Sequence, residues 1–272
     1  METALEIKTA RLRELLRGLG SVVVAFSGGV DSSLLLKLAH LELGERALAV
    51  VAASATYPQR ELEEALSVAR VVGARCAVVE TNELSDPRFA GNPPDRCYYC
   101  KLELFARLRQ VAVENGMAWV LDGSNMDDLK DVRPGSRAAR EAGVRSPLQE
   151  VGLSKSEVRE LARSLGLPDW SKSAQACLAS RIPYGDAVTP ERLRRVAAAE
   201  DILQRLGFSQ VRVRMHGPVA RLEVPASELD KLMADEVRNG VVRELKDLGF
   251  VFVCLDMEGY RTGSLNEPLK DA

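Results

Sequence analysis

The chain has 272 residues and a formal net charge of −2 at pH 7, with 46% hydrophobic and 28% charged residues. This is ordinary globular composition, and the charge excludes a global basic field that would draw the chain onto nucleic acid or an acidic membrane. No apolar run reaches the roughly 18 residues of a membrane span, and the N-terminal segment lacks the apolar core of a signal peptide. We therefore expect a cytoplasmic protein with reduced cysteines and with no membrane or nucleic-acid partner.

Apolar periodicity predicts alternating helices and strands over the first part of the chain. A helix over 4–18 precedes the apolar, β-branched run 21–26, which is typical of a buried parallel strand. The pattern then predicts helix 31–42, strand 46–53, helix 59–72, strand 76–81, a long loop 82–100, helix 101–115, strand 117–122, an irregular stretch 124–147 and helix 154–165. This alternation indicates an α/β fold whose parallel sheet carries helices on both faces. Ligands of such sheets bind beyond the carboxyl ends of the strands.

The pattern changes after about residue 185. A helix from Thr189 to about Leu206 is followed by strands 210–215 and 219–224. A helix over 226–247, broken near Asn239-Gly240, and a final strand over 249–255 complete the chain. These elements indicate a smaller α+β domain, so we expect two domains, 1–185 and 186–272.

The segment Ser27-Gly28-Gly29-Val30-Asp31-Ser32-Ser33 lies between a predicted buried strand and a helix. Its glycines let backbone amides approach a phosphate, and the helix N-terminus adds a positive dipole end. The loop has no lysine and matches neither the Walker pattern nor GxGxxG. A capped helix after a tight turn is the simpler alternative. Ser54 and Gly123 follow later predicted strands, at the edge of the sheet where a ligand would bind.

Three of the five cysteines fall in motifs. Cys97 and Cys100 form a CxxC pair, and Cys177 lies just before the predicted domain boundary. The pair alone is compatible with half of a zinc site, a redox pair or chance, but zinc usually takes four protein ligands. Three thiolates could instead hold a [4Fe–4S] cluster with one iron left open. Cys76 and Cys254 lie in apolar strand patterns, where we expect buried core residues.

SGGVDS at 27–32 resembles the signature of the PP-loop ATP pyrophosphatases, which transfer AMP from ATP to a substrate oxygen. Together the motifs resemble the LarE-type pyridinium-3,5-biscarboxylic acid mononucleotide sulfurtransferases, which act in assembly of the nickel-pincer cofactor of lactate racemase. The resemblance covers nearly the whole chain. It rests on SGGVDS, DRCYYCK at 95–101, DGSNMDD at 122–128, RPG at 133–135, ACLASR at 176–181, PYG at 183–185 and RVRMHG at 212–217.

The resemblance implies the adenine nucleotide alpha hydrolase-like fold, ATP and Mg²⁺ as cofactors, and a small pyridinium nucleotide as substrate. It places the nucleotide at Ser27, Gly28, Gly29, Asp31, Ser32, Ser54, Gly123 and Asn125. It implies catalytic roles for Cys97, Cys100, Cys177, Ser180 and Arg181, and substrate binding by Glu200, Arg212 and Arg214. The second domain would then bind substrate and form homo-oligomer contacts. Since Arg212 and Arg214 are two apart on a predicted strand, we expect them to share one face.

The resemblance leaves two sulfur sources open. In one version the cysteine at position 177 gives up its own sulfur and becomes dehydroalanine. In the other, three cysteines hold a [4Fe–4S] cluster that carries an extra sulfide, and the presence of Cys97, Cys100 and Cys177 favours this version. The chain departs from the family at Ser173, where proline is usual, and at Ile182, where phenylalanine is common.

Three rival functions remain. A tRNA thiolase of the same superfamily shares the adenylation step, although no RNA-binding module is evident. A non-catalytic module that binds AMP or ATP would leave the cysteine trio without a role, as would an ammonia-using ligase.

Overall fold

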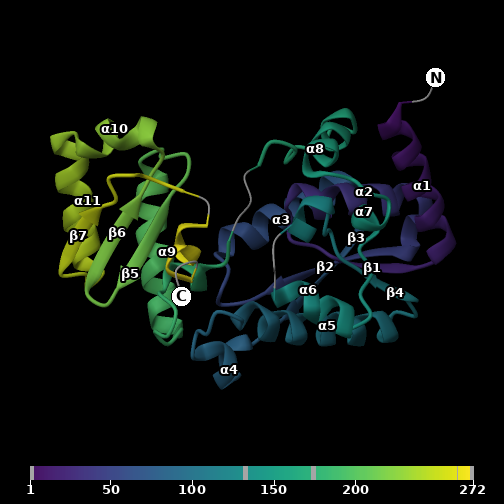
Figure 1. Ribbon diagram of the computed structural model, residues 1–272, viewed down its shortest axis with the longest axis horizontal. Helices are drawn as coiled ribbons and strands as arrows, with labels where there is room; N and C mark the ends of the chain where they lie inside the picture. Colours follow the sequence, from purple (N-terminus) through teal and green to yellow (C-terminus); the bar gives the residue numbers. More distant parts are fainter. Residues whose placement is uncertain (1–2, 131–133, 173–175, 262, 270–272) are drawn as a thin grey trace. The chain divides into compact units, whose positions relative to one another are not determined.

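The computed structural model describes residues 3–130, 134–172, 176–261 and 263–269 (Figure 1). The chain divides into two compact units, Met1–Asp86 with Asp95–Gln175 and Pro87–Pro94 with Ala176–Ala272. Residues 87–94 and 176–185 therefore belong to the second compact unit. The division into domains 1–185 and 186–272, which rests on the sequence pattern, stays a prediction. None of the helices in the described ranges is long and apolar enough to cross a membrane.

The first unit has the predicted alternation of helices and strands. Its elements are α1 (Ala4–Leu19), β1 (Val22–Ala25), α2 (Val30–Leu43), η1 (Gly44–Arg46), β2 (Ala47–Ala53), α3 (Gln59–Val72), β3 (Arg75–Glu80), η2 (Glu83–Ser85), α5 (Arg96–Glu114), β4 (Trp119–Leu121), η3 (Met126–Lys130), α6 (Pro134–Glu141), α7 (Pro147–Glu150) and α8 (Lys155–Ser164). The strands form a four-stranded parallel sheet in the order β3-β2-β1-β4. The predicted α/β fold is therefore confirmed.

Both faces of this sheet are buried because apolar side chains alternate along the strands. Val22 and Val24 of β1 point into a core shared with α1, α2, α3 and α8, whereas Val23 points into a second core with α5 and α6. Figure 1 shows α5 and α6 on one side of the strands and α2, α7 and α8 on the other. The carboxyl ends of the strands are left for the loops that carry the predicted nucleotide site.

Two helix starts in this unit bear on the site. Helix α5 begins at Arg96, five residues before the predicted start, so that the CxxC pair lies inside its first turn. Helix α8 begins as predicted with a capping box, in which Ser154 accepts from the amide of Glu157 and the Glu157 carboxylate accepts from that of Ser154.

The second unit is built around a mixed three-stranded sheet. Its elements are α4 (Pro87–Ala90), η4 (Leu178–Arg181), α9 (Pro190–Arg205), β5 (Arg212–His216), β6 (Val219–Glu223), η5 (Ala226–Glu228), α10 (Leu229–Met233), α11 (Asp235–Asp247), β7 (Phe252–Leu255) and η6 (Ser264–Leu269). Strands β5 and β6 form an antiparallel hairpin, and β7 pairs with β6 in parallel. The side chain of Asn92, just after α4, donates to the carbonyl oxygens of Ile182 at 3.2 Å and Pro183 at 2.7 Å, which ties 87–94 to this unit.

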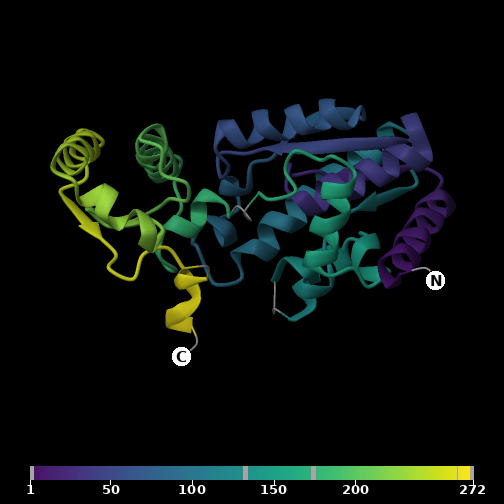
Figure 2. The same ribbon diagram turned by 90° about the horizontal axis from the view of Figure 1, so that it is seen from above.

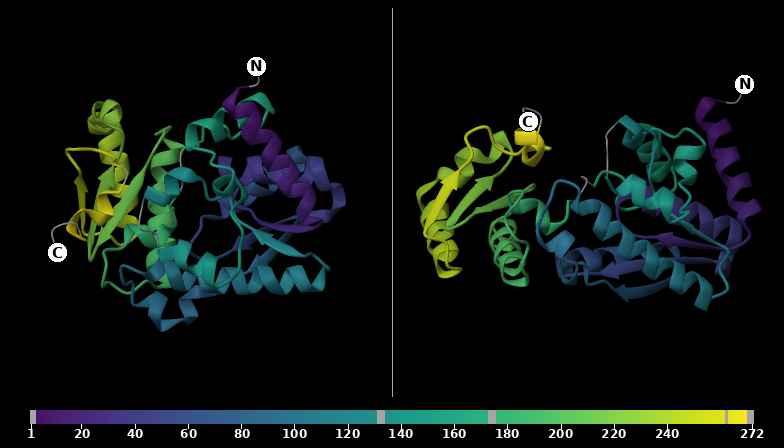
Figure 3. Two further views of the ribbon diagram at one scale, coloured as in Figure 1. Left: turned by 45° about the vertical axis from the view of Figure 1, so that its right-hand side comes forward. Right: turned by 60° about the horizontal axis from the view of Figure 1, so that its bottom comes forward.

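The two faces of this sheet differ in chemistry. Val213, Met215 and Leu222 are buried on the face covered by α9 and α11. The alternate positions Arg212 and Arg214 share the opposite face, as predicted, and η6 lies on that side (Figures 2 and 3). A charged face is thus enclosed by the C-terminal segment.

Several local predictions were wrong. Helix α4 lies within the predicted loop 82–100, and helix α6 lies within the stretch 124–147 that was predicted to be irregular. The predicted helix over 226–247 is interrupted at Ala234, whose φ of −56° and ψ of 133° are extended, and Gly240 lies within α11. A glycine inside a helix costs only about 1 kcal/mol relative to alanine, so it need not break the helix. Cys76 and Cys254 are exposed rather than buried. The reason is that β3 and β7 are edge strands of their sheets.

Candidate active site

The loop 27–33 joins β1 to α2 at the carboxyl end of the parallel sheet. Gly29 is the N-cap of α2 and offers no capping side chain. The Ser32 hydroxyl donates to the carbonyl oxygen of Gly29 at 3.0 Å and accepts from the amide of Ser27 at 3.3 Å. The loop is therefore held by its own serines, and the first-turn amides of α2 suit a phosphate group.

Two glycines allow close backbone approaches around this loop. Gly28 has a φ of +68°, and a Cβ at this position would lie 2.8 Å from the Cα atom of Ala65 in α3. A Cβ on Gly123, after β4, would lie 2.8 Å from the amide nitrogen of Ser32. Because both neighbours include backbone atoms, no side-chain rotation would relieve either clash. The loops after β1 and β4 are thus in direct contact.

Asp31 is the centre of a polar cluster in the first turn of α2. Its carboxylate accepts from Asn125 Nδ2 at 3.0 Å and forms an ion pair with Lys155 Nζ. Asn125 is buried, and its amide donates to Asp128 Oδ2 at 2.9 Å. The amide of Lys155 donates to Asp127 Oδ2 at 2.7 Å, which fixes the start of α8 beside this cluster. Lys155 supplies the positive charge that the loop sequence itself lacks.

Ser54 lies in a second polar cluster, at the end of β2. One oxygen of the Glu83 carboxylate accepts from both the Ser54 hydroxyl and the Thr56 hydroxyl, the latter at 2.5 Å. Thr56 and Glu83 are buried. The turn after β2 is therefore held in one conformation by a buried carboxylate.

The three motif cysteines are divided between the two units. Cys97, which is exposed, and Cys100, which is half-buried, lie in the first turn of α5, and half-buried Cys177 is the N-cap of η4 in the second unit. Across the described ranges, no group of three or more His, Cys, Asp or Glu residues is arranged to hold a metal ion. The three-thiolate site for a [4Fe–4S] cluster stays a prediction.

Arg181 fixes the segment that carries Cys177. Its side chain is 2% exposed and forms a two-point ion pair with Glu200, Nε to Oε1 at 2.8 Å and Nη2 to Oε2 at 2.9 Å. Its Nη1 atom donates to the carbonyl oxygens of Ala176 at 2.5 Å and Cys177 at 3.0 Å. The same atom donates to Ser180 Oγ at 2.9 Å. A buried charge pair thus holds the main chain on both sides of the thiol-bearing residue.

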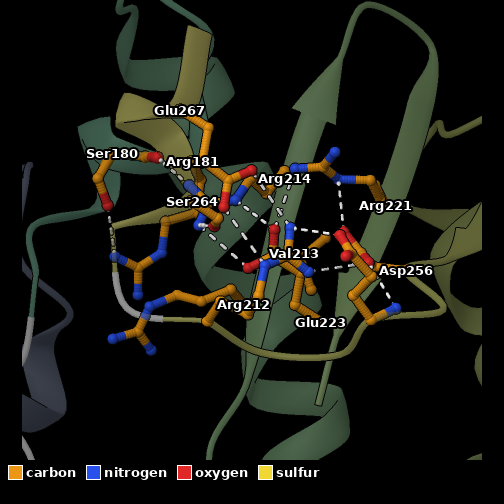
Figure 4. A network of polar contacts seen from close by, with 12 residues as sticks. Ser180, Arg181, Arg212, Val213, Arg214, Arg221, Glu223, Asp256, Ser264 and Glu267 are labelled. Atoms are coloured by element: carbon orange, nitrogen blue, oxygen red, sulfur yellow. Dashed lines mark hydrogen bonds and ion pairs between the residues drawn. The ribbon is translucent and has the colours of Figure 1, made fainter. Parts of the chain in front are cut away.

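Arg214 is similarly engaged (Figure 4). Its Nε and Nη2 atoms donate to Glu223 at 2.6 and 3.0 Å. Nη1 donates to the carbonyl oxygen of Ser180 at 2.7 Å, and Nη2 also donates to Ser264 Oγ at 2.7 Å. The guanidinium therefore joins β5, β6, η4 and η6.

Arg212 has a different environment. It is 4% exposed, yet no described carboxylate lies within ion-pairing distance of it. Its Nη1 atom donates to the carbonyl oxygen of Val211 at 2.7 Å. The side-chain amide of Gln210 lies beside both Nη atoms, and rotation of this amide would let its oxygen accept from them at 3.2 Å. Burial lowers the pKa of Arg212, and the charge of Arg181 lowers it further. Such a desolvated guanidinium is suited to an incoming anion.

The sequence of the chain is similar to those of known proteins, and these similarities identify its family. Residues 8–113 match the NAD synthase family. The chain is 43% identical over 269 residues to the pyridinium-3,5-bisthiocarboxylic acid mononucleotide synthase of Lactiplantibacillus plantarum, covering 98% of this chain and 97% of that protein. The chain belongs to the LarE-type synthase family.

Two further relatives are similar to this LarE-type chain. A Synechocystis protein described as uncharacterised is 45% identical over 265 residues, covering 97% of this chain and 99% of that protein. A glutamine-hydrolysing GMP synthase component from Archaeoglobus fulgidus is 30% identical over 220 residues, covering 75% of this chain and 70% of that protein. The comparisons do not favour the tRNA thiolase or the non-catalytic module.

Within this LarE-type chain the structure gathers the predicted residues into two sets. Ser27, Gly28, Gly29, Asp31, Ser32, Gly123 and Asn125 meet in the first unit, and Cys177, Ser180, Arg181, Glu200 and Arg214 are linked in the second. Ser173, and Arg133 of the 133–135 motif, lie outside the described residues. The oxygens of Glu200 are taken by Arg181 and by the amide of Val213, so its contact with substrate stays a prediction.

Sequence reasoning missed four residues: Lys155 and Glu223, which belong to these two sets, and Thr56 and Glu83, which belong to the separate cluster around Ser54. A signal for Lys155 was present, because a lysine directly after an N-cap opposes the helix dipole. Such a local conflict often marks a functional position. Thr56 and Glu83 are joined by a contact between positions 27 apart, and the role of Glu223 depends on the register of the β5–β6 hairpin.

Proposed function

We propose that this chain catalyses ATP-dependent sulfur transfer to the carboxylates of pyridinium-3,5-biscarboxylic acid mononucleotide, in biosynthesis of the nickel-pincer cofactor of lactate racemase. The observation that carries the proposal is the 43% identity over 98% of the chain to a protein named as the synthase of the bisthiocarboxylic product. The retained phosphate loop and Cys177 support it.

The first step is adenylation. A carboxylate oxygen of the substrate attacks the α-phosphorus of ATP, and pyrophosphate leaves. The amides of loop 27–33 and the ammonium of Lys155 are suited to the polyphosphate. Mg²⁺ bound with a nucleotide usually takes one or two carboxylates together with phosphate oxygens, and Asp31 at the loop fits that donor set. Bound there, the ion would neutralise charge on the leaving pyrophosphate.

In the second step Cys177 is the sulfur nucleophile. Its thiolate attacks the acyl carbon, and AMP leaves with the former carboxylate oxygen, giving a thioester. A base then removes the Cα proton of Cys177, the Cβ–S bond breaks, and sulfur keeps the bonding electrons. The products are a thiocarboxylate and dehydroalanine. The contacts of Arg181 with the carbonyls around Cys177 support this role, because they position the attacking residue.

The direct test incubates the protein with ATP, Mg²⁺ and the pyridinium dicarboxylate nucleotide under mass spectrometry. We expect pyrophosphate and AMP, one exchange of oxygen for sulfur in the substrate, and loss of H₂S from the chain at Cys177. Cys177→Ala should release pyrophosphate but transfer no sulfur, whereas Cys254→Ala, at an exposed position outside the motifs, should behave as the parent. Sulfur transfer by Cys177→Ala would refute the role of this thiol.

The alternative sulfur source is a [4Fe–4S] cluster held by Cys97, Cys100 and Cys177, in which Cys177 is a ligand in place of the sulfur donor; the three cysteines in the sequence support it. Its measurement is iron and acid-labile sulfide per chain after purification without oxygen. About four irons per chain, lost in Cys97→Ala, are expected from a site of this type. Absence of iron after reconstitution would contradict the cluster, and Cys177 would then be the sulfur donor.

A homo-oligomeric state, a cytoplasmic location and the lack of a nucleic-acid partner remain part of the proposal. Sedimentation of the purified chain tests the first, and salt-sensitive tRNA binding would contradict the last.

A further inference from the structure

The three buried arginines of the second unit differ in what their guanidinium groups contact. Arg181 and Arg214 each form a two-point ion pair, with Glu200 and Glu223 respectively. Arg212 is as deeply buried, but its described partners are a backbone carbonyl and the amide of Gln210. Of the three, Arg212 therefore has the charge least compensated by its own chain, and an anionic ligand group would compensate it.

The aromatic ring of Tyr260 stands over this guanidinium. Its centroid lies 5.3 Å from Arg212 Cζ. Two backbone features hold the residue there. The amide of Tyr260 donates to the carbonyl oxygen of Val224 at 2.8 Å, and Gly259 has a φ of +71° with no room for a Cβ, which would lie 2.7 Å from that same oxygen. The chain thus brings the ring to the arginine face of the sheet by a path that requires glycine at 259.

An anion on Arg212 would have the Tyr260 ring as its neighbour. If the anion is a carboxylate on a flat ring, that ring can lie against the phenol face while its carboxylate meets the guanidinium. A cationic ring is attracted to the Tyr260 ring more strongly than a neutral one, because the face of an aromatic side chain is its negative region. A saturated ring bearing the same carboxylates gains neither stacking nor cation–π attraction.

We propose that Tyr260 is a specificity-determining residue, whose ring stacks on the aromatic cation of the substrate while Arg212 binds a carboxylate attached to that ring. This inference rests on the proposed function, and it identifies the feature of the substrate that the second unit recognises. It requires no chemistry at Tyr260, and the phenol oxygen is dispensable.

The test compares three dicarboxylates of matched spacing by calorimetry: N-methylpyridinium-3,5-dicarboxylate, benzene-1,3-dicarboxylate and cis-cyclohexane-1,3-dicarboxylate. The parent chain should bind them in that order of decreasing affinity, with about a tenfold difference between the first and last. Tyr260→Phe should keep the order. Tyr260→Leu should reduce the difference to about twofold or less, and Arg212→Gln should weaken all three.

The affinity ratio separates recognition from a structural role, because a Tyr260 that only supports Arg212 would weaken all three ligands equally when replaced by leucine. Equal weakening, retention of the preference in Tyr260→Leu, or equal binding of the three ligands by the parent would overturn the inference. Failure of the proposed function has a different signature: the parent would show the affinity order yet form no thiocarboxylate from the pyridinium nucleotide and ATP.

Discussion

The two units arrange their charged side chains in different ways. In the first unit, backbone amides and hydroxyls at the strand ends surround one ion pair, Lys155–Asp31, whose side chains are 30% and 23% exposed. In the second unit, Arg181–Glu200 and Arg214–Glu223 are removed from solvent, with side-chain exposures of 7% or less. The first arrangement brings together segments distant in the sequence, because Lys155 and Asp31 are 124 positions apart, but it remains open to water. The second holds only while every partner is present.

This difference predicts unequal tolerance to mutation. Removing a partner from a buried pair leaves an uncompensated charge, whereas an exposed cluster can be hydrated.

Arg181→Met should have the largest effect. It leaves Glu200 buried without its cation, which should destabilise the second unit by about 3–5 kcal/mol. Sulfur transfer should be lost, while ATP binding in the first unit persists. Denaturant titration measures the free energy of unfolding, and calorimetry measures the affinity for ATP. Arg205→Met, at the exposed pair with Glu244, is the matched control and should cost less than about 1 kcal/mol. Equal losses from the two variants would contradict the contrast.

Lys155→Met should have the second-largest effect. Charged hydrogen bonds contribute about 1.5–3 kcal/mol, so the apparent affinity for ATP should fall at least about tenfold. The unfolding midpoint should change little because the ion pair is partly hydrated. Lys172→Met, at the pair with Glu64, is the control for loss of a lysine. An unchanged KM for ATP would contradict the prediction that Lys155 binds the nucleotide.

Gly123→Ala should weaken ATP binding by distorting the loop. The new Cβ meets the backbone of Ser32 at 2.8 Å, and overpacking of this kind costs about 1–3 kcal/mol. Gly18→Ala in α1, where nothing lies within 4 Å, should bind ATP as the parent does. Normal ATP affinity in Gly123→Ala would show that the loop can move without loss of its function.

The smallest effect concerns His216, at the end of β5. Desolvation, followed by the charges of Arg221 and Arg214, lowers its pKa below the ordinary 6.5. The unfolded state therefore binds the proton more readily, so the contribution of His216 to stability is complete above about pH 6.5 and declines as the pH falls below that value. An NMR titration should find the lowered pKa, and Arg221→Gln should raise it. A value above 6.5 would contradict the positive field on this face.

The predictability of the two regions differs for the same physical reason. The loop 27–33 could be identified because a phosphate site at a strand–helix junction needs glycines and hydroxyls that are adjacent in sequence. The shared face of Arg212 and Arg214 followed from strand periodicity. That Arg214 would pair with Glu223 while Arg212 would have no carboxylate depends on the register of β5 against β6, which no local pattern contains. The position of the helix interruption at Ala234 is equally a matter of tertiary packing.

The contacts of Arg181 bear on the stability of the chain after sulfur transfer. They reach main-chain oxygens of the thiol-bearing segment and not the sulfur atom. Conversion of Cys177 to dehydroalanine would leave these contacts in place, so a spent chain would keep its fold and its nucleotide loop. Used molecules would then compete with fresh ones for ATP, and their removal would fall to proteases that recognise something other than unfolding.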